Sequence, residues 1–439
     1  MAAPRPACPP SGDSCPPVRV GRIGADGDGV AALPNGAALF LPGTLPGELA
    51  QPGAPSRRGE GWTAQAIVRE PSADRISPPC PHFGPCGGCT LQHWRDGAYA
   101  DWKLAQVADA LRRMGAPEVG LTLARTPPAT RRRMDLAIRR EGPVLRIGLH
   151  RRRSREVVDM QACPVLHPKL FALVQALRPV LLRLAGLRRE GSAVVNLLDS
   201  GPDLLLRTDA PLTAGDRVLL TTLARTHELP RISWEPGAAR GGTGLTEPAC
   251  SLRPATTAFN GIATPIPPGA FLQASLEGEA AIVAAVLAAL PDGLPAKARV
   301  VELFAGVGSI THALATRGRV QAYEGDDAAY DALRRAANPR VTATRRDLAR
   351  QPLQVAELKG AGAVVLDPPH GGALAQMPAL AASGVPVVYV SCNPAALARD
   401  GRTLMQAGYQ VASAAAIDQF LWSARVESVV AFRSPAPRR

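Results

Sequence analysis

Short apolar runs alternate with glycine and proline clusters along the chain, and their spacing changes from one part to the next. From Val18 to about Ile76, β-like runs are separated by Gly, Pro and Asp, a pattern typical of a small β-barrel. The segment from Ala98 to Gly115 has apolar residues at helical spacing and ends at a glycine, which predicts a helix. From Thr130 to about Arg253 the pattern indicates mixed α and β structure.

The remainder of the chain repeats one kind of unit. The stretch "FLQASLEGEAAIVAAVLAAL" predicts a strong helix, and units of strand, glycine loop and helix follow it to the end. One of these units is "VVYVSCNPAALARD", in which four apolar residues lead into Ser-Cys-Asn-Pro and then a helical pattern. Alternating strands and helices of this kind predict an α/β domain with a doubly wound, Rossmann-like sheet.

Composition narrows the choice of partners and compartment. The formal charge of +13 and a pI near 10 favour a polyanionic partner such as nucleic acid, although the arginine bias could also come from a GC-rich genome. No run approaches about 18 uninterrupted apolar residues, so no membrane span is expected. The N-terminus has no apolar h-region, and we expect a cytoplasmic protein whose eight cysteines serve as metal ligands, catalysts or packing.

Four cysteines have the pattern of a metal site. Cys80, Cys86 and Cys89 lie in "CPHFGPCGGC", where two adjacent glycines let the backbone fold tightly. Cys163, also followed by proline, is the best candidate for a fourth ligand. Thiolate-rich sites bind zinc or an iron–sulfur cluster, and the absence of paired C-x2-C hooks favours iron–sulfur.

Acidic residues follow successive predicted strands in the C-terminal part. The strand in "ARVVELFAGVGSITHALA" leads into a turn with Gly306 and Gly308, where the backbone can approach a ligand closely. Glu324 ends the next strand and could accept both hydroxyls of a ribose. Asp347 and Asp367 end two more strands. This succession is the arrangement of class I S-adenosylmethionine methyltransferases; a nucleotide site is the alternative, although the third glycine and the P-loop lysine are missing.

Cys392 admits two interpretations from its surroundings. A cysteine at the carboxyl end of a strand lies where open α/β sheets place their chemistry, but most such thiols are inert packing. The start of the following helix is a plausible source of thiolate stabilisation. The rest of the chain favours a nucleophile.

These motifs together resemble the bacterial RNA uracil-5-methyltransferase family, specifically the iron–sulfur-containing 23S rRNA (uracil-C5)-methyltransferases. The resemblance covers about residues 16 to 432 and is carried by "CPHFGPCGGCTLQHW", "FLQAS", "VVELFAGVGS", "LDPP", "YVSCNPAALARD" and "RVESVVAF". Combined with the residue patterns, it predicts four parts: a disordered lead-in at 1–15; an OB-like, TRAM-type RNA-binding barrel at 16–76; a central α+β iron–sulfur domain at 77–97 and 117–262; and a methyltransferase domain at 98–116 and 263–439.

The resemblance also implies roles for individual residues. Cys392 would be the nucleophile and Glu427 the base, and the four cysteines would bind a [4Fe-4S] cluster. His370 follows "DPP" where the family usually has arginine, and Ser309 and Asp347 stand where asparagine is expected. The cofactor S-adenosylmethionine would be bound by Gln273, Phe304, Ser309, Glu324, Asp347 and Asp367.

The implied reaction transfers a methyl group to C5 of a uridine in RNA, with 23S rRNA as the expected substrate, through a covalent bond from Cys392 to C6. We expect a monomer that binds neither DNA nor membrane. The alternatives are a tRNA uridine-5-methyltransferase, an RNA cytosine-5-methyltransferase, an amino-group methyltransferase, and a non-enzymatic RNA-binding iron–sulfur protein. The cytosine enzymes usually have Pro-Cys where this chain has "DPPH", and an amino-group enzyme would need no cysteine.

Overall fold

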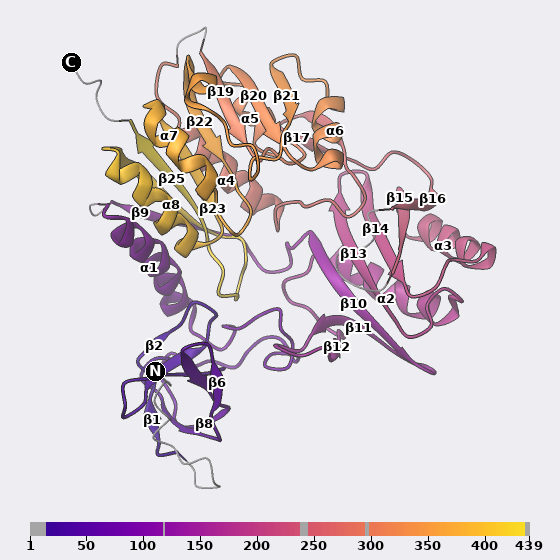
Figure 1. Ribbon diagram of the computed structural model, residues 1–439. Coiled ribbons are helices and arrows are strands. Elements are labelled where there is room, and N and C mark those ends of the chain that lie inside the picture. The colour runs from indigo at the N-terminus through magenta and orange to yellow at the C-terminus, as the bar shows by residue number, and fades with distance from the viewer. Residues whose placement is uncertain (1–14, 117–118, 238–244, 295–297, 435–439) are drawn as a thin grey trace. The chain divides into compact units, whose positions relative to one another are not determined.

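The computed structural model describes residues 15–116, 119–237, 245–294 and 298–434 (Figure 1). The chain divides into two compact units. The first comprises residues up to 102 together with 150–155 and 422–425, and the second comprises 103–149, 156–421 and the residues from 426 onward. Within the described residues, no helix is long and apolar enough to cross a membrane.

The first unit is built from short strands, as its sequence pattern predicted. One sheet has the order β1-β5-β8 and the other β2-β3-β4-β7-β6. The alternation of buried and half-buried residues in β4 turns Leu39 and Leu41 into the core, where they meet Val20 and Ala50. The strands are β1 (Val18–Arg19), β2 (Arg22–Ile23), β3 (Gly29–Ala32), β4 (Ala38–Leu41), β5 (Leu49–Pro52), β6 (Ser56–Arg58), β7 (Gly61–Thr63) and β8 (Ala66–Glu70).

Cys15 corrects the predicted limit of the lead-in. We expected residues 1–15 to be disordered, but Cys15 is 2% exposed and belongs to the core of the first unit. It is also disulfide-bonded, whereas reduced thiols were expected. The other residues predicted for the lead-in lie outside the described residues.

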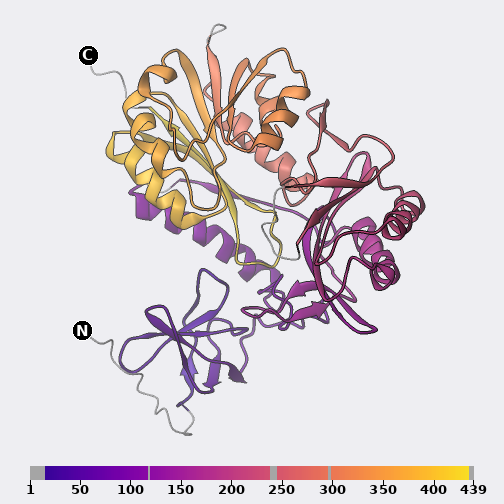
Figure 2. The same cartoon turned by 45° about the vertical axis from the view of Figure 1, so that its right-hand side comes forward.

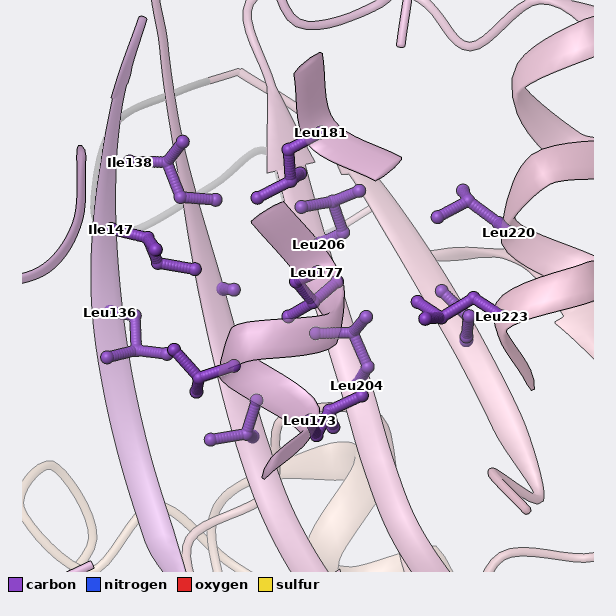
Figure 3. Close-up of a cluster of buried hydrophobic side chains, with 14 of the residues drawn as sticks. Leu136, Ile138, Ile147, Leu173, Leu177, Leu181, Leu204, Leu206, Leu220 and Leu223 are labelled. Carbon is purple, nitrogen blue, oxygen red and sulfur yellow. The ribbon is translucent and has the colours of Figure 1, made fainter. Parts of the chain in front are cut away.

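The second unit contains a seven-stranded sheet of order β12-β11-β10-β13-β14-β15-β16. Helices α2 and α3 cover one face of it (Figure 2). Apolar residues one turn apart on α2, Leu173, Leu177 and Leu181, pack against Leu136 and Leu204 of the sheet (Figure 3). The elements are β10 (Arg133–Glu141), β11 (Val144–His150), β12 (Val157–Asp159), α2 (Pro168–Arg183), β13 (Glu190–Leu198), β14 (Gly201–Thr208), α3 (Ala214–Thr226), β15 (Arg231–Pro236) and β16 (Glu247–Ser251).

The second sheet of this unit has eight strands in the order β21-β20-β19-β22-β23-β25-β24-β9. Strands β19 to β23 are parallel, and β25 is antiparallel to both of its neighbours. The doubly wound sheet predicted from the sequence is therefore present. Its strands are β9 (Leu121–Arg125), β19 (Arg299–Leu303), β20 (Arg319–Glu324), β21 (Val341–Arg345), β22 (Ala361–Leu366), β23 (Val387–Ser391), β24 (Gln410–Asp418) and β25 (Glu427–Arg433).

Helices pack on both faces of the eight-stranded sheet. Successive strand residues point to opposite faces, so Val301 packs with α7 and α8 while Val300 packs with α4 and α6. A hairpin of β17 (Thr256–Phe259) and β18 (Ile262–Pro265) comes just before α4 in the chain. The helices are α4 (Leu276–Ala289), α5 (Thr311–Leu314), α6 (Asp327–Arg335), η1 (Val355–Leu358), η2 (Leu374–Gln376), α7 (Met377–Ser383) and α8 (Pro394–Gln406).

Two early elements belong to this sheet. Helix α1 (Asp96–Met114) ends at Gly115, as predicted, and its residues Ala110, Leu111 and Met114 lie in the same core as α7 and α8. Strand β9 lies in the range predicted for the central domain, yet it pairs in parallel with β24 at the sheet edge. The eight-stranded sheet is thus completed by a segment almost three hundred residues earlier in the chain.

Candidate active site

Three candidate residues lie at one edge of the eight-stranded sheet. Asp367 follows the parallel strand β22, and Cys392 follows β23. Because β25 is antiparallel to β23, its first residue lies at the edge where β23 ends. Ser391 pairs with Ser428, which puts Glu427 and Cys392 next to this pair at the same edge. This is the edge at which open α/β sheets bind their ligands.

Cys392 lies in a short, well-braced connection between β23 and α8. It is half-buried. The Ser391 hydroxyl accepts from the Asn393 N–H at 3.1 Å, and the Asn393 side chain accepts from the Ala395 N–H at 3.0 Å, capping α8. Pro394 occupies the first turn, where its missing N–H costs nothing. The thiol is therefore held beside the positive end of a 13-residue helix.

The loop after Asp367 is fastened to the same helix. Asn393 donates from its side chain to the His370 carbonyl at 2.9 Å. Asp400, which is fully buried, accepts from the Tyr389 hydroxyl and from the Ala373 N–H, both at 2.7 Å. The "DPPH" loop is consequently hydrogen-bonded to the cysteine loop and, through Ala373, to α8.

The glycine turn after β19 has the backbone of a ligand-binding loop. Phe304 has φ +63°, which is rare for a residue with a side chain, and Gly306 and Gly308 also have positive φ. A Cβ on Gly308 would lie 2.8 Å from the Leu333 side chain of α6, and the φ of +100° at this position is one that L side chains rarely adopt. Strained residues of this kind cluster at functional sites.

Glu324 is bound to the glycine turn. Its carboxylate accepts from the backbone N–H of Gly306 at 2.7 Å and from those of Gly325 and Asp326 at 2.8 and 2.7 Å. The half-buried Ser309 lies on the same turn. Asp347 is exposed, and its carboxylate accepts from the N–H of Ala349 and Arg350 in its own turn. Among the described residues, no hydrogen bond or ion pair joins Asp347 to another candidate residue.

Two glutamine side chains connect Asp367 with Glu427. Gln273 donates to Asp367 Oδ2 at 3.2 Å. Gln419 donates to Gln273 Oε1 at 2.7 Å and to Glu427 Oε2 at 2.9 Å. Glu427 Oε1 is buried without a hydrogen-bond partner in the described structure. The site therefore brings together Gln273, Asp367 and Glu427 from distant parts of the sequence.

Burial dominates the electrostatics of these carboxyl groups. It raises the pKa of Glu427, and the neighbouring Asp367 raises it further, while the Gln419 hydrogen bond opposes both. Burial likewise raises the pKa of Asp367. Glu302, in β19, has its pKa raised to about 8 by burial. Carboxyl groups with raised pKa values at a sheet edge are typical of active sites.

Sequence patterns did not identify Glu302 or Gln419 as site residues. Glu302 was visible as the acidic residue of "VVELFAG", and Gln419 as a polar residue just after a predicted strand. Nothing in the sequence showed that Gln419 contacts Glu427, because the seven residues between them form a loop between antiparallel strands.

The predicted metal ligands are all half-buried. Cys80, Cys86 and Cys89 lie on one irregular loop of the first unit, and Cys163 lies in the second unit. The loop is tight as predicted: Gly87 donates to the His150 carbonyl at 3.0 Å, and a Cβ there would lie 2.7 Å from that oxygen. Over the described ranges, no three His, Cys, Asp or Glu side chains form a group able to hold a metal ion.

Comparison with known proteins gives the same class. The family model "tRNA (Uracil-5-)-methyltransferase" matches residues 340–434. An uncharacterised RNA methyltransferase of Brucella melitensis is 40% identical over 94% of this chain and 96% of its own. The 23S rRNA (uracil(1939)-C(5))-methyltransferase RlmD of Chromohalobacter salexigens is 34% identical over 95% of this chain and 89% of its own.

A solved structure agrees in fold. The Pyrococcus abyssi tRNA (uracil-54, C5)-methyltransferase, in complex with S-adenosyl-L-homocysteine, superposes with a TM-score of 0.72 at 20% identity, covering 95% of this chain and all of its own. Fold and matches define an α/β methyltransferase. The chain belongs to the RNA uracil-5-methyltransferase family, whose members depend on S-adenosylmethionine, and the predicted family and enzyme class are confirmed.

Proposed function

We propose that this enzyme methylates C5 of a specific uridine in 23S rRNA, with Cys392 as nucleophile and Glu427 as base. The observation that carries the proposal is the meeting of these two residues at one sheet edge, through the pairing of Ser391 with Ser428. S-adenosylmethionine supplies an electrophilic methyl group when bound. Residues of this chain carry out the remaining steps.

The Cys392 thiolate attacks C6 of uracil, and the electron pair of the C5–C6 double bond moves into an enolate. C5 of this enolate is nucleophilic enough to bond to the methyl group, and the sulfur–methyl bond of the donor would break to leave a neutral thioether. Glu427 then takes the proton from C5. The electrons of the C5–H bond re-form the double bond, the bond from sulfur to C6 breaks, and the thiolate is regenerated.

The cofactor is assigned to the edge that holds the glycine turn. Phe304 and Ser309 belong to this turn, and Glu324 is hydrogen-bonded to it. Gln273 and Asp367 are connected to Glu427 through Gln419. Asp347 is included on the sequence pattern alone. The proposed contacts are Gln273, Phe304, Ser309, Glu324, Asp347 and Asp367.

The choice of 23S rRNA over tRNA rests on one relative. RlmD acts on 23S rRNA and shares 34% identity, whereas the P. abyssi tRNA enzyme shares 20%. Mapping 5-methyluridine in rRNA and tRNA from cells with and without the protein tests the assignment. Loss of one 5-methyluridine from 23S rRNA is the expected result. Loss confined to tRNA would mean that the substrate is tRNA and not 23S rRNA. No loss in either RNA would contradict the proposal.

The first unit and the four cysteines complete the proposal. We assign the strands before residue 76 to a TRAM-type RNA-binding barrel, supported by their number and brevity. We assign Cys80, Cys86, Cys89 and Cys163 to a [4Fe-4S] cluster, supported by the ligand type and loop spacing. The protein acts as a cytoplasmic monomer on RNA and not on DNA.

Metal analysis tests the cluster. Anaerobically purified protein should be brown and contain about four iron and four sulfide per chain. Cys163→Ser should reduce the cluster content as much as Cys86→Ser, and Cys250→Ser, outside the proposed ligand set, should leave it unchanged. Stoichiometric zinc without acid-labile sulfide would contradict the assignment.

A further inference from the structure

We infer that Gln419 is a positioning residue that directs Glu427 Oε1 toward the proton on C5. Gln419 lies just after β24 and is 3% exposed. The inference rests on the proposed function, because it concerns the base assigned there. It adds a residue and an atom that neither the fold nor the family resemblance specifies.

The direction of the hydrogen-bond chain is fixed by a backbone group. The Ala274 N–H donates to Gln419 Oε1 at 3.0 Å. A backbone N–H can only donate, so the oxygen of the Gln419 amide must face Ala274 and its NH2 group must face the opposite way. The two hydrogens of that NH2 group are then used on Gln273 Oε1 and Glu427 Oε2.

This polarity decides which oxygen of Glu427 is the base. Oε2 accepts from the NH2 group of Gln419, whose oxygen faces Ala274 instead. A proton on Oε2 would therefore point at the hydrogens of a donor and have no acceptor there. Oε1 is buried and has no partner in the described structure. The proton from C5 therefore goes to Oε1. The donor on Oε2 stabilises the ionised carboxylate that must be present before proton transfer.

Packing holds Gln419 in this orientation. A Cβ on Gly278, in the first turn of α4, would lie 2.7 Å from Gln419 Cβ and 3.0 Å from its Oε1. The segment that carries Ala274 is held in turn by the buried Arg132, which donates to the Gln273 carbonyl at 3.1 Å and pairs with Glu279 at 2.6 Å. Gln419 is thus closely packed against α4, and the hydrogen bond from Ala274 sets which way its amide faces.

The test separates the step that Gln419 supports from the earlier steps. Gln419→Met keeps the size of the side chain and removes both donors. We expect methyl transfer into the covalent complex to persist and release of methylated RNA to slow on the order of tenfold, the usual loss for a charge-assisted hydrogen bond. The pH at which the release rate rises should also increase. Glu427 has lost the donor that favours its ionised form, so its pKa should be higher.

Two further variants keep the result interpretable. Gln419→Glu keeps an oxygen to accept from Ala274 but presents an acceptor to Glu427 in place of the donor. Release of methylated RNA should therefore slow at least as much as with Gln419→Met. Gln376 is a buried glutamine whose side chain bonds to the backbone of Leu353 and Leu348, and Gln376→Met should leave the release rate and its dependence on pH unchanged. Equal effects of Gln376→Met and Gln419→Met would mean that Gln419 is merely structural.

Glu427→Gln distinguishes failure of this inference from failure of the proposed function. If Glu427→Gln traps a methylated complex but both Gln419 variants release RNA at the wild-type rate and pH dependence, the positioning role is wrong. If Glu427→Gln traps nothing, the base itself is wrongly assigned and the role of Gln419 is rejected with it.

Discussion

Glu302 is a buried carboxyl group in β19 of the eight-stranded sheet, and its pKa is raised to about 8 by burial. Between its unfolded value of 4.5 and this value, the folded state holds a proton that the unfolded state has lost. The stability that Glu302 contributes is therefore present below pH 4.5 and is lost as the pH rises through about 8. Glu302→Gln should remove this loss of stability with rising pH.

Denaturant unfolding of the wild type and Glu302→Gln at several pH values between 5 and 8 measures the effect. The difference in free energy of unfolding should grow with pH in favour of the variant, by on the order of 1 kcal/mol per pH unit. Glu277→Gln, an exposed replacement in α4, is the control and should show no such trend. Parallel pH curves for the wild type and Glu302→Gln would show that Glu302 ionises normally.

Single residues were predictable from the sequence where their role depends on strand ends. Cys392 and Asp367 were placed from the pattern of apolar runs and Glu427 from the family resemblance, and the structure puts all three at one edge of the sheet. Gln419 was not predictable, because its role depends on which atoms of Ala274, Gln273 and Glu427 surround it. Those neighbours are fixed only by the tertiary fold.

At the scale of elements, helix α1 is fastened to β24 by a buried ion pair. Lys103 Nζ lies 2.8 Å from Asp418 Oδ1, and both side chains are fully buried. Burial lowers the pKa of Lys103, and Asp418 opposes that shift. Lys103→Met should destabilise the protein by about 3–5 kcal/mol, because it leaves the buried Asp418 charge without its ammonium partner.

The same helix provides a matched control. Arg112 pairs with Asp109 on the exposed side of α1, and Arg112→Met should cost under about 1 kcal/mol. Chemical denaturation of both variants gives the comparison. Similar small losses for Lys103→Met and Arg112→Met would show that the buried pair does not fasten the helix.

Elements with local signals were predicted correctly, and those defined by distant partners were not. Helices α1, α4 and α8 follow from apolar spacing within each segment, and Ser275 and Asn393 cap the starts of α4 and α8. Strand β9 has an ordinary strand pattern, but its place beside β24 depends on a pairing of Leu121 with Ala414. No local pattern encodes a pairing over that separation.

At the scale of the whole molecule, the charge of +13 predicts salt-dependent RNA binding. The structure shows that the arginines of the chain are not equally accessible. Arg132 of "RRRMDLAIRR" is fully buried and paired with Glu279, whereas Arg57 of β6 is exposed. RNA affinity should fall steeply between low and physiological salt, and Arg57→Ala should reduce the slope by about one counterion.

Filter binding of a 23S rRNA fragment at several salt concentrations measures these slopes. Arg132→Ala should instead lower the thermal stability without changing the slope of the folded protein. A flat salt dependence for the wild type would rule out binding through phosphates.

The central claim is that Cys392 acts before methyl transfer and Glu427 after it. Both Cys392→Ala and Glu427→Gln should abolish turnover, but they should stop the reaction at different points. Without the thiol no bond to C6 forms, whereas with Glu427→Gln the thiolate adds, the methyl group is transferred and the C5 proton remains. The variants should be compared after confirming that each is folded and binds the cofactor.

The most direct measurement is denaturing electrophoresis of each variant after incubation with 23S rRNA fragment and S-adenosylmethionine labelled in the methyl group. Glu427→Gln should give a denaturation-resistant protein–RNA band that carries the label, Cys392→Ala should give none, and the double variant should behave as Cys392→Ala. A folded, cofactor-binding Glu427→Gln that never forms the labelled band, or a labelled band with Cys392→Ala, would contradict the proposed mechanism.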